Sequence, residues 1–530
     1  MTEVPNKQDS QIFLYSSLLQ LVAFIICILM PNMLVFGAET EVDSRNQRDL
    51  PQAEHADQRE FYELVVSGEH HQAFERAFEL GDELFETQFN ALDGVGANVG
   101  EQQRFTRVPR ADLSGFGEWA DHTPKRETGP NAQACNACHN LPFDDGAGQT
   151  NSNVHRDPLH SANLSTMIQR NTPHLFGAGA VQLLAEEMTK RLHRIQKRAT
   201  RLACSTGKSQ TRMLRAKGVQ FGLLTVRPIQ NSPCQVNIDS SKVTGVSSDL
   251  IIRPFQWKGN NTTLRDFNRG ASHNELGMQA VELVGRDEDG DFDGVTNEMT
   301  IGDQTALVIY IAAQPRPTTK IELSRLGLIE PLSSYERKGI RRGKQLFSRI
   351  GCASCHTPRL KIQDPIFREP SLQAHHRDEI FPSGLNPLDE LVNPAFPVTF
   401  DLTRDQPDNI VHDQDGKEIR LGTFERDRRG RAIVRLYSDL KHHDLGSGLA
   451  ESIDETGTGS STWLTKELWG VGSTAPYLHD GRATTLSDAI LEHSGEADDS
   501  RQTFLSLSPV GKNNLLSFLE NLVLFKIESE

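Results

Sequence analysis

Apolar residues recur at helical spacing in two well-defined stretches of this chain. Ile340, Gly343 and Phe347 fall on one face of a predicted helix over 334–347. The glycine on that face would let a second helix cross closely. Another helix is expected over 509–523, because a proline in the first turn is followed by leucines and valine at helical spacing.

Elsewhere the apolar pattern changes. Residues 218–257 contain short apolar runs with β-branched side chains, which predict a small excursion of strands. Residues 367–431 are rich in Pro, Asp and Arg and predict long loops. The prolines of 315–333 indicate a boundary between domains. We therefore expect a mainly α fold with one domain over 61–314, a linker over 315–333 and a second domain over 334–530.

The longest apolar run covers 12–30, close to the N-terminus, and small residues at 37 and 38 precede a polar stretch. This order resembles a signal peptide cut near residue 38. An uncleaved membrane anchor is the alternative, because the run approaches the roughly 20 residues that span a bilayer. We expect 1–38 to be this leader or anchor, 39–60 to be a flexible linker, and the rest of the chain to be periplasmic.

The sequence Cys-x-x-Cys-His occurs twice, at Cys135, Cys138 and His139 and at Cys352, Cys355 and His356. This spacing is typical of a covalently attached c-type haem, in which two thiols add to the vinyl groups and the histidine binds the iron. Two redox disulfides or one Cys₄ zinc site are the alternatives. The motif pair predicts two covalently bound haems.

Short signatures flank both motifs in the same order. Gly-Asp-Glu-Leu-Phe at 81–85 and Gly-Lys-Gln-Leu-Phe at 343–347 precede them, and Leu-Phe-Gly-Ala-Gly at 175–179 and Leu-Trp-Gly-Val-Gly at 468–472 follow them. The shared order indicates a duplicated module. The expected fold is therefore two cytochrome c-like haem domains with long loop insertions and a small β excursion in the first.

The net charge limits the possible partners, and the remaining cysteines indicate a disulfide. The 530-residue chain has a formal net charge of −15, which argues against nucleic acid and anionic membrane as partners and is compatible with a basic electron donor. Of seven cysteines, four lie in the motifs and Cys27 lies in the leader. Cys204 and Cys234 are expected to form a disulfide, although two buried thiols are the alternative.

The sixth position of each iron decides between electron transfer and catalysis. For the second haem the candidate is His493, at the end of a predicted helix over 484–493, with His443 as an alternative ligand; His493 could also be an ordinary core histidine. For the first haem, His155 and His160 lie in a loop after the motif, where they are either ligands or exposed histidines.

Three polar residues after the first Leu-Phe-Gly motif, Gln182, Glu186 and Glu187, are candidates for acid–base help to a bound peroxide. Both glutamates would equally suit an exposed helix face. Trp257 lies in a polar stretch and is a candidate electron relay between the haems, with core packing as the alternative.

Asp289, Asp291 and Asp293 alternate around a glycine turn. Oxygen ligands at this spacing suit Ca²⁺. The loop differs from an EF-hand because Thr300 stands where the bidentate glutamate is expected. The alternative is a solvated acidic turn.

Longer stretches carry a family resemblance. The segment 468–493, with Ala-Pro-Tyr-Leu-His-Asp-Gly-Arg at 475–482, is similar to the C-terminal signature of di-haem peroxidases related to bacterial cytochrome c peroxidase and MauG. Together with 171–177, 255–259, 273–278 and 438–446, it makes the chain resemble the di-haem oxidoreductase branch labelled thiol oxidoreductase, over about 60–525. No spare cysteine pair in a reactive motif supports the thiol label.

The resemblance implies that the two haems face the domain interface, with calcium often found between the domains. It implies that the Cys352 haem accepts electrons from a small redox protein or a quinol-linked donor, and that the Cys135 haem reduces peroxide or oxidises a partner protein. His493 stands where such peroxidases have a methionine, and a second imidazole would lower the haem potential. The alternative function is a non-catalytic carrier with both irons six-coordinate.

Overall fold

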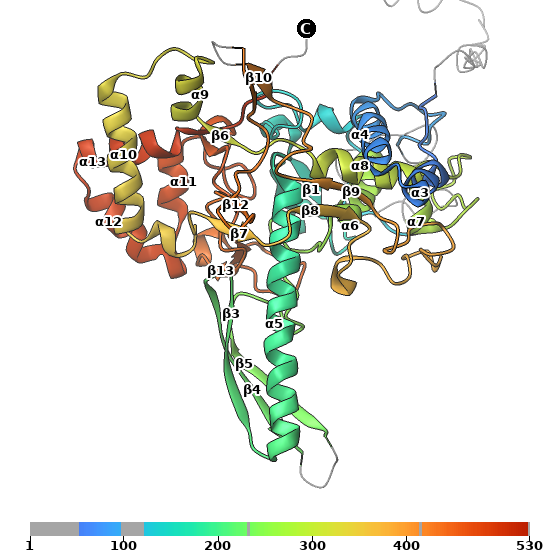
Figure 1. Ribbon diagram of the computed structural model, residues 1–530, viewed down its shortest axis with the longest axis horizontal. Helices are drawn as coiled ribbons and strands as arrows, with labels where there is room; N and C mark the ends of the chain where they lie inside the picture. The colour runs from blue at the N-terminus through green and yellow to red at the C-terminus, as the bar shows by residue number, and fades with distance from the viewer. Residues whose placement is uncertain (1–51, 97–120, 230–233, 413–415, 528–530) are drawn as a thin grey trace, which may run out of the picture. The chain divides into compact units, whose positions relative to one another are not determined.

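The computed structural model describes residues 52–96, 121–229, 234–412 and 416–527 (Figure 1). The segment Gln52–Glu530 forms one compact unit. The predicted leader, Cys27 and most of the predicted linker lie outside the described residues. Helix α3 begins at Gln58, so the chain is already folded before residue 60. Within the described ranges, no helix has the length and apolar character needed to cross a bilayer.

The first helix pair consists of α4, His70–Glu86, and α8, Ile301–Ala312. Gly81 of α4 lies against the backbone of Ala306, where an added Cβ would clash. The glycine of the first Gly-x-x-Leu-Phe signature therefore lets α8 cross α4 at close range. The first motif follows α4 in the chain, after a long connection.

The second helix pair repeats this arrangement. Helix α10, Ser334–Arg349, packs on α13, Pro509–Leu519, and Gly343 lies against the backbone of Asn514. The predicted close crossing at Gly343 is confirmed. The C-terminal helix ends earlier than expected, because Leu522–Val523 forms strand β15.

Further helices connect these pairs. They are α6, Leu264–Ala271; α7, Val281–Val284; α9, Lys320–Leu326; α11, Leu486–Glu492; and α12, Asp498–Ser506. A π-helical turn, Ser272–Leu276, continues α6. The boundary over 315–333 is not a bare linker, because it contains α9 and strand β6, Thr318–Thr319, which pairs with β15.

The predicted β excursion is an antiparallel sheet in the order β3-β4-β5, with strands Gln210–Ala216, Val219–Pro228 and Val236–Val243. It lies beside α5, Ala178–Thr206, and the two extend away together from the other elements of Gln52–Glu530 (Figure 1). The predicted disulfide between Cys204 and Cys234 is confirmed. We call residues 188–229 and 234–243 the arm.

The remaining strands form two-stranded sheets that fix the loops. Their pairs are β1, Val154–Arg156, with β2, Ile168–Arg170; β7, Leu360–Ile362, with β12, Ala432–Val434; β8, Ile366–Glu369, with β9, Val398–Asp401; β10, Ile410–His412, with β11, Glu418–Arg420; and β13, His442–Asp444, with β14, Thr462–Leu464. The region 367–431 is therefore loop-rich, with short strands inside it.

Candidate functional site

Each Cys-x-x-Cys-His motif borders its own cavity. Cys352, Cys355 and His356 line a cavity of about 310 Å³, and Cys135, Cys138 and His139 line one of about 160 Å³. Both cavities are lined mainly by apolar side chains. Because the two motifs line different cavities, the four cysteines do not form one zinc site. The cavities are called the Cys352 cavity and the Cys135 cavity below.

The duplicated signatures place equivalent aromatic rings beside the motif histidines. Phe85 at the end of α4 lies with its ring centre 6.0 Å from that of His139. Phe347 near the end of α10 lies 6.4 Å from His356 by the same measure. The phenylalanine of each signature therefore packs against the imidazole that follows it in the fold.

Both motif histidines are held through Nδ1. The Nδ1 atom of His139 lies 3.2 Å from the carbonyl oxygen of Gly146, and that of His356 lies 3.0 Å from the carbonyl oxygen of Tyr437. Metal-binding histidines characteristically donate their second ring N–H in this way, which leaves Nε2 as the ligand atom. Burial lowers the pKa of each of these imidazoles to about 4, so both are neutral at pH 7.

His493 faces His356 across the Cys352 cavity. It follows α11, whose N-cap Thr485 accepts a hydrogen bond from the backbone N–H of Asp488, and its Nδ1 lies 2.7 Å from the carbonyl oxygen of Ala489. The two imidazole centres are 6.5 Å apart. Because metal–imidazole bonds are about 2.0–2.1 Å long, two imidazoles on opposite sides of one metal have their centres roughly 6 Å apart. The pair therefore fits a single iron with two histidine ligands.

His443 also lines the Cys352 cavity, but both of its nitrogens are occupied. Nδ1 lies 2.7 Å from a carboxylate oxygen of Glu496, and Nε2 lies 3.0 Å from one of Asp439. Burial alone would lower the pKa of His443, but its hydrogen bonds, first of all with Asp439, raise it to about 10. A protonated imidazole has no lone pair for iron, so the structure favours His493 over His443.

The Cys135 cavity differs in its axial donors. Among the described residues that line it, His139 is the only histidine, and no methionine or lysine joins it. His155 does not reach this cavity, because its neighbours Val154 and Arg156 on strand β1 line it and side chains alternate along a strand. The His155 Nε2 atom instead lies 3.0 Å from the side-chain nitrogen of Gln169. His160 is also outside the cavity lining.

An acidic residue that the sequence analysis did not select lines the Cys135 cavity. Glu275 lies in the π-helical turn after α6, and such turns are frequent at functional sites. Burial raises its pKa to about 7, against the opposing influence of Arg156 and a hydrogen bond with Asn131. Its Oε2 atom is buried without a hydrogen-bond partner among the described residues. Glu275 was within reach of the sequence analysis, because it lies in the stretch 273–278 that carried the family resemblance.

The residues predicted for acid–base catalysis lie elsewhere. Gln182 Nε2 donates to Glu186 at 3.2 Å, and Gln182 Oε1 accepts the backbone N–H of Leu264 at 2.9 Å. Glu187 forms an ion pair with Lys217. None of the three predicted residues lines either cavity, although Ala178 and Val181 of the same helix line the Cys352 cavity. The structure therefore does not bring Gln182, Glu186 and Glu187 to the site, because they face other sides of α5.

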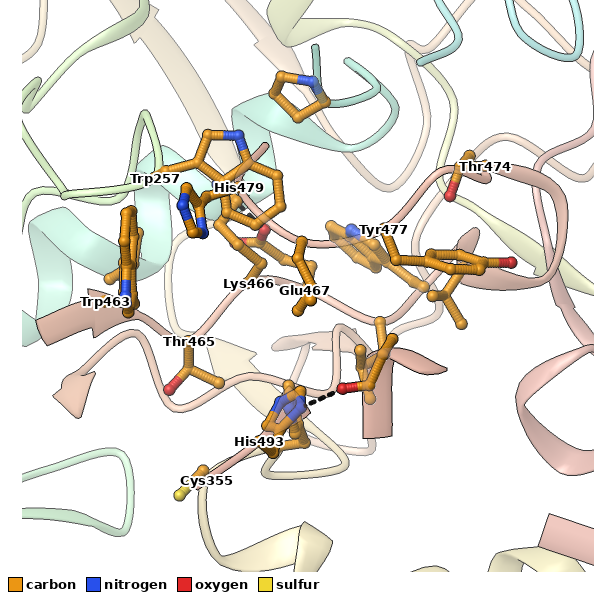
Figure 2. A pocket seen from close by; sticks show the side chains of 18 of the residues that line it. Trp257, Cys355, Trp463, Thr465, Lys466, Glu467, Thr474, Tyr477, His479 and His493 are labelled. Carbon is orange, nitrogen blue, oxygen red and sulfur yellow. Dashed lines mark hydrogen bonds and ion pairs between the residues drawn. The ribbon is translucent and has the colours of Figure 1, made fainter. Parts of the chain in front are cut away.

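Trp257 lines both cavities. Its indole N–H donates to the carbonyl oxygen of Asn171 at 2.8 Å, which fixes the ring. In Figure 2, Trp257 lies across the pocket from Cys355 and His493. The indole is therefore part of the wall that the two cavities share.

A second tryptophan on this side has a different environment. Trp463 stacks on the ring of His479 with centres 3.9 Å apart (Figure 2). The Lys258 ammonium lies 3.9 Å from the centre of the indole. Trp463 lines the Cys352 cavity but not the Cys135 cavity. A nearby cation opposes removal of an electron from this ring.

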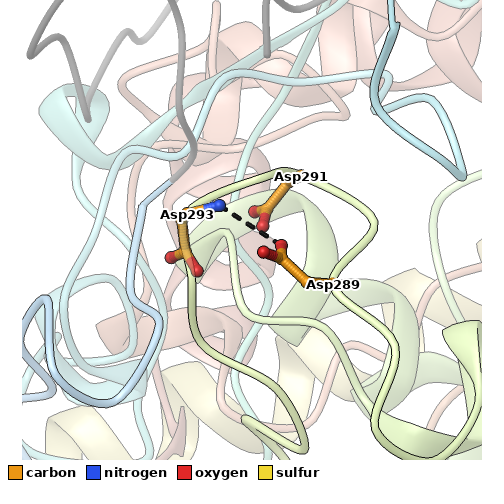
Figure 3. A group of neighbouring side chains, drawn as sticks. All are labelled: Asp289, Asp291 and Asp293. Atoms are coloured by element: carbon orange, nitrogen blue, oxygen red, sulfur yellow. Dashed lines mark hydrogen bonds between the residues drawn. The ribbon is translucent and has the colours of Figure 1, made fainter.

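The predicted oxygen cluster does come together. Figure 3 shows Asp289, Asp291 and Asp293 around the turn, with oxygens all within 4.8 Å of one another. Asp291 is buried and pairs with Arg126 at 2.8 Å. Glu298 is buried nearby, and burial, followed by repulsion from Asp291 and Asp293, raises its pKa well above the usual range.

Comparison with known proteins relates the chain to one family. Residues 428–522, which include His493, match the family described as "Di-haem oxidoreductase, putative peroxidase". The match confirms the relationship with di-haem oxidoreductases that the segment 468–493 led us to expect. No curated protein matches the chain. Among solved structures, a MauG-like protein associated with microbial copper homeostasis aligns at 16% identity over 51% of this chain and 68% of that chain, with a TM-score of 0.24.

Proposed function

We propose that this chain is a periplasmic di-haem c-type oxidoreductase of the peroxidase type. The observation that carries the proposal is the contrast between the two cavities. The Cys352 cavity presents two facing imidazoles, His356 and His493, whereas the Cys135 cavity presents one imidazole and the partly buried acid Glu275. Two strong axial ligands suit electron transfer, and an open position suits catalysis.

The residues present fit haem at both sites. Burial raises the pKa of Cys135 to about 12 and that of Cys352 to about 11, so both groups are protonated thiols at neutral pH before a cofactor is attached. They would hold the haems as thioethers, with His139 and His356 as proximal ligands. When bound, the haems would supply one-electron redox chemistry and a site for cleaving the O–O bond.

Glu275 performs the proton chemistry in this proposal. Reduction of one hydrogen peroxide to two waters consumes two electrons and two protons. A carboxylate at the Cys135 cavity takes a proton from the peroxide oxygen that faces the metal position and returns it to the leaving oxygen. A pKa of about 7 allows both transfers near neutral pH.

In this proposal, electrons pass from the Cys352 cavity to the Cys135 cavity through the wall that the two cavities share. Trp257 contacts both cavities, and we propose it as the relay from the Cys352 side to the Cys135 side. A small redox protein or a quinol-linked protein would supply the electrons. A side chain of a partner protein is a second oxidisable substrate consistent with the same site.

We further propose Ca²⁺ at the turn of Asp289, Asp291 and Asp293. Glu298 is 2% exposed, and its Oε1 atom has no hydrogen-bond partner among the described residues. The oxygens of Asp289, Asp291 and Asp293 lie within 4.8 Å of one another, and repulsion from Asp291 and Asp293 acts on Glu298, so a divalent cation would offset the negative charge gathered at this turn. The ion would join this loop to Glu298 at the start of the segment leading to α8.

The proposal is tested on the purified exported protein. Pyridine haemochrome analysis should give two haems per chain, and EPR should give one high-spin and one low-spin ferric signal. Hydrogen peroxide should be consumed with a reduced small cytochrome as donor. Two low-spin signals with no peroxide turnover would instead establish the carrier, and absence of haem would overturn both functions.

A further inference from the structure

The arm has a charge opposite to that of the chain as a whole. Between Glu187 and Asp239 the sequence contains eleven lysines and arginines and no acidic residue, in a chain of net charge −15. The average composition therefore conceals a strongly basic segment. The expectation that anionic membranes are excluded as partners rests on the net charge alone.

Six of these cations form one stripe along α5. They are Lys190, Arg191, Arg194, Lys197, Arg198 and Arg201, and all six side chains are exposed. Their spacing of three, four and seven residues places them on one side of a helix. The stripe covers eleven residue steps, or about 16 Å of helix axis. Within the described residues, none of the six cations forms an ion pair.

The side of α5 opposite the stripe packs against the rest of the protein. Leu192, Ala199 and Ala203 are buried in the hydrophobic core, where α5 packs on strands β3 and β4. This packing orients the stripe outward before any partner binds. In Figure 1 this half of α5 extends away from the helix pairs. Asp249 lies beside His193 of this helix and forms its ion pair with Arg253. Acidic residues farther away are largely screened from the stripe, because interactions between exposed charges fall off beyond about 8 Å at physiological salt.

We propose that the stripe docks the protein on an anionic phospholipid surface. Between residues 190 and 201 no large apolar side chain is exposed, whereas a stable protein interface needs an apolar core. The segment contains no Phe, Tyr or Trp, and its one imidazole, that of His193, already stacks on His375, which argues against stacking on single-stranded nucleic acid bases. A straight, outward row of cations instead matches a flat negative surface, which attracts Lys and Arg without insertion.

Vesicle co-sedimentation tests the proposal on the full holoprotein. The vesicles contain phosphatidylcholine alone or with about 30% phosphatidylglycerol, in 50 mM or 300 mM NaCl, conditions chosen because surface electrostatics fall with salt. The wild-type protein should bind the anionic vesicles about tenfold more than the neutral ones at low salt, and lose this preference at high salt. An uncleaved apolar leader would insert into both vesicles, so the difference between them reports the stripe.

Two variants that remove the same number of positive charges test whether the stripe causes the preference for anionic vesicles. The variant K190Q/R194Q/K197Q/R201Q should lose most of the preference for anionic vesicles. The control K338Q/R341Q/R342Q/R349Q removes the same charge from exposed positions of α10 and should retain it. An unchanged haem absorption spectrum and circular dichroism would show that both variants fold.

Three results would overturn the proposal. They are equal binding of the wild type to both vesicles, an equal loss in the control variant, and displacement from anionic vesicles by a stoichiometric 30-base-pair DNA duplex, which would assign the stripe to nucleic acid. Vesicle binding does not require peroxide turnover. Its failure is therefore distinguishable from failure of the proposed enzymatic function.

Discussion

His493 and His356 face each other with imidazole centres 6.5 Å apart and ring planes inclined by 58°. They come from segments more than a hundred residues apart, and each is held by an Nδ1 contact with a backbone carbonyl. Fixing both rings before the cofactor is present reduces the reorganisation needed to bind it. In the proposed function, this pair makes the Cys352 side the electron-transfer side.

Replacing His493 by alanine should convert the haem at Cys352 from low spin to high spin, because one axial imidazole is lost. H493M should restore a low-spin signal at a higher reduction potential. EPR and redox titration measure both effects. H443A serves as the control, because His443 pairs with Asp439 and Glu496 and should leave the spin state unchanged. A low-spin H493A protein would show that another side chain binds the iron.

The variant E275Q should lower peroxide turnover about 10²-fold or more, because the amide cannot take a proton. Haem content and the low-spin signal should remain. The carboxyl has a pKa of about 7, so in the wild type the deprotonated base decreases as pH falls through 7 and the rate should fall with it. The variant should lack this limb of the pH profile. A wild-type-like profile in E275Q would remove Glu275 from the mechanism.

Trp257→Phe should slow steady-state peroxide turnover by about tenfold or more, equivalent to ~1.4 kcal/mol of barrier, while both spin states persist. The comparison is Trp463→Phe, because Trp463 lines only one cavity and lies beside the Lys258 ammonium. Stopped-flow mixing of the reduced protein with peroxide measures the transfer. Equal slowing in the two variants would show that the shared wall position has no special role.

Local patterns in the sequence predicted much of this architecture. Each Cys-x-x-Cys-His motif places its two cysteines and its histidine within five consecutive residues. Gly343 marked a close helix crossing, and Thr485 marked the start of α11, because a crossing glycine and an N-cap are encoded by the residues themselves. Such signals do not depend on distant parts of the chain.

The side chains that line the two cavities were harder to predict, because their positions depend on packing between distant segments. Strand β1 is three residues long, too short to show which of its side chains faces inward, and His155 faces away from the cavity. Glu186 follows the cavity-lining Val181 by little more than one turn, but the rotation of α5 in the fold turns it elsewhere. Glu275 enters the site through a π-helical turn, which has no simple periodicity.

Calcium should raise the melting temperature of the protein relative to EGTA, because binding only to the folded state stabilises it by about 2.7 kcal/mol at 100 times Kd. D289N/D293N should abolish this difference. Asparagine is chosen because its side-chain oxygen can still accept hydrogen bonds from the backbone of the turn. One such bond is the 2.9 Å bond from the Gly294 N–H to Asp289. The control E79Q/E83Q removes equal charge from exposed positions of α4. A calcium response that survives in D289N/D293N would place the ion elsewhere.

Glu186 should affect stability rather than catalysis. Burial raises its pKa from 4.5 to about 7, so the folded protein holds a proton between these values that the unfolded chain releases. Stability must therefore fall as pH rises through this window, by up to about 3 kcal/mol, since one pKa unit corresponds to about 1.36 kcal/mol. E186Q should melt higher than the wild type at pH 8 and close to it at pH 5, with peroxide turnover unchanged. A large loss of turnover in E186Q would return this residue to the catalytic site.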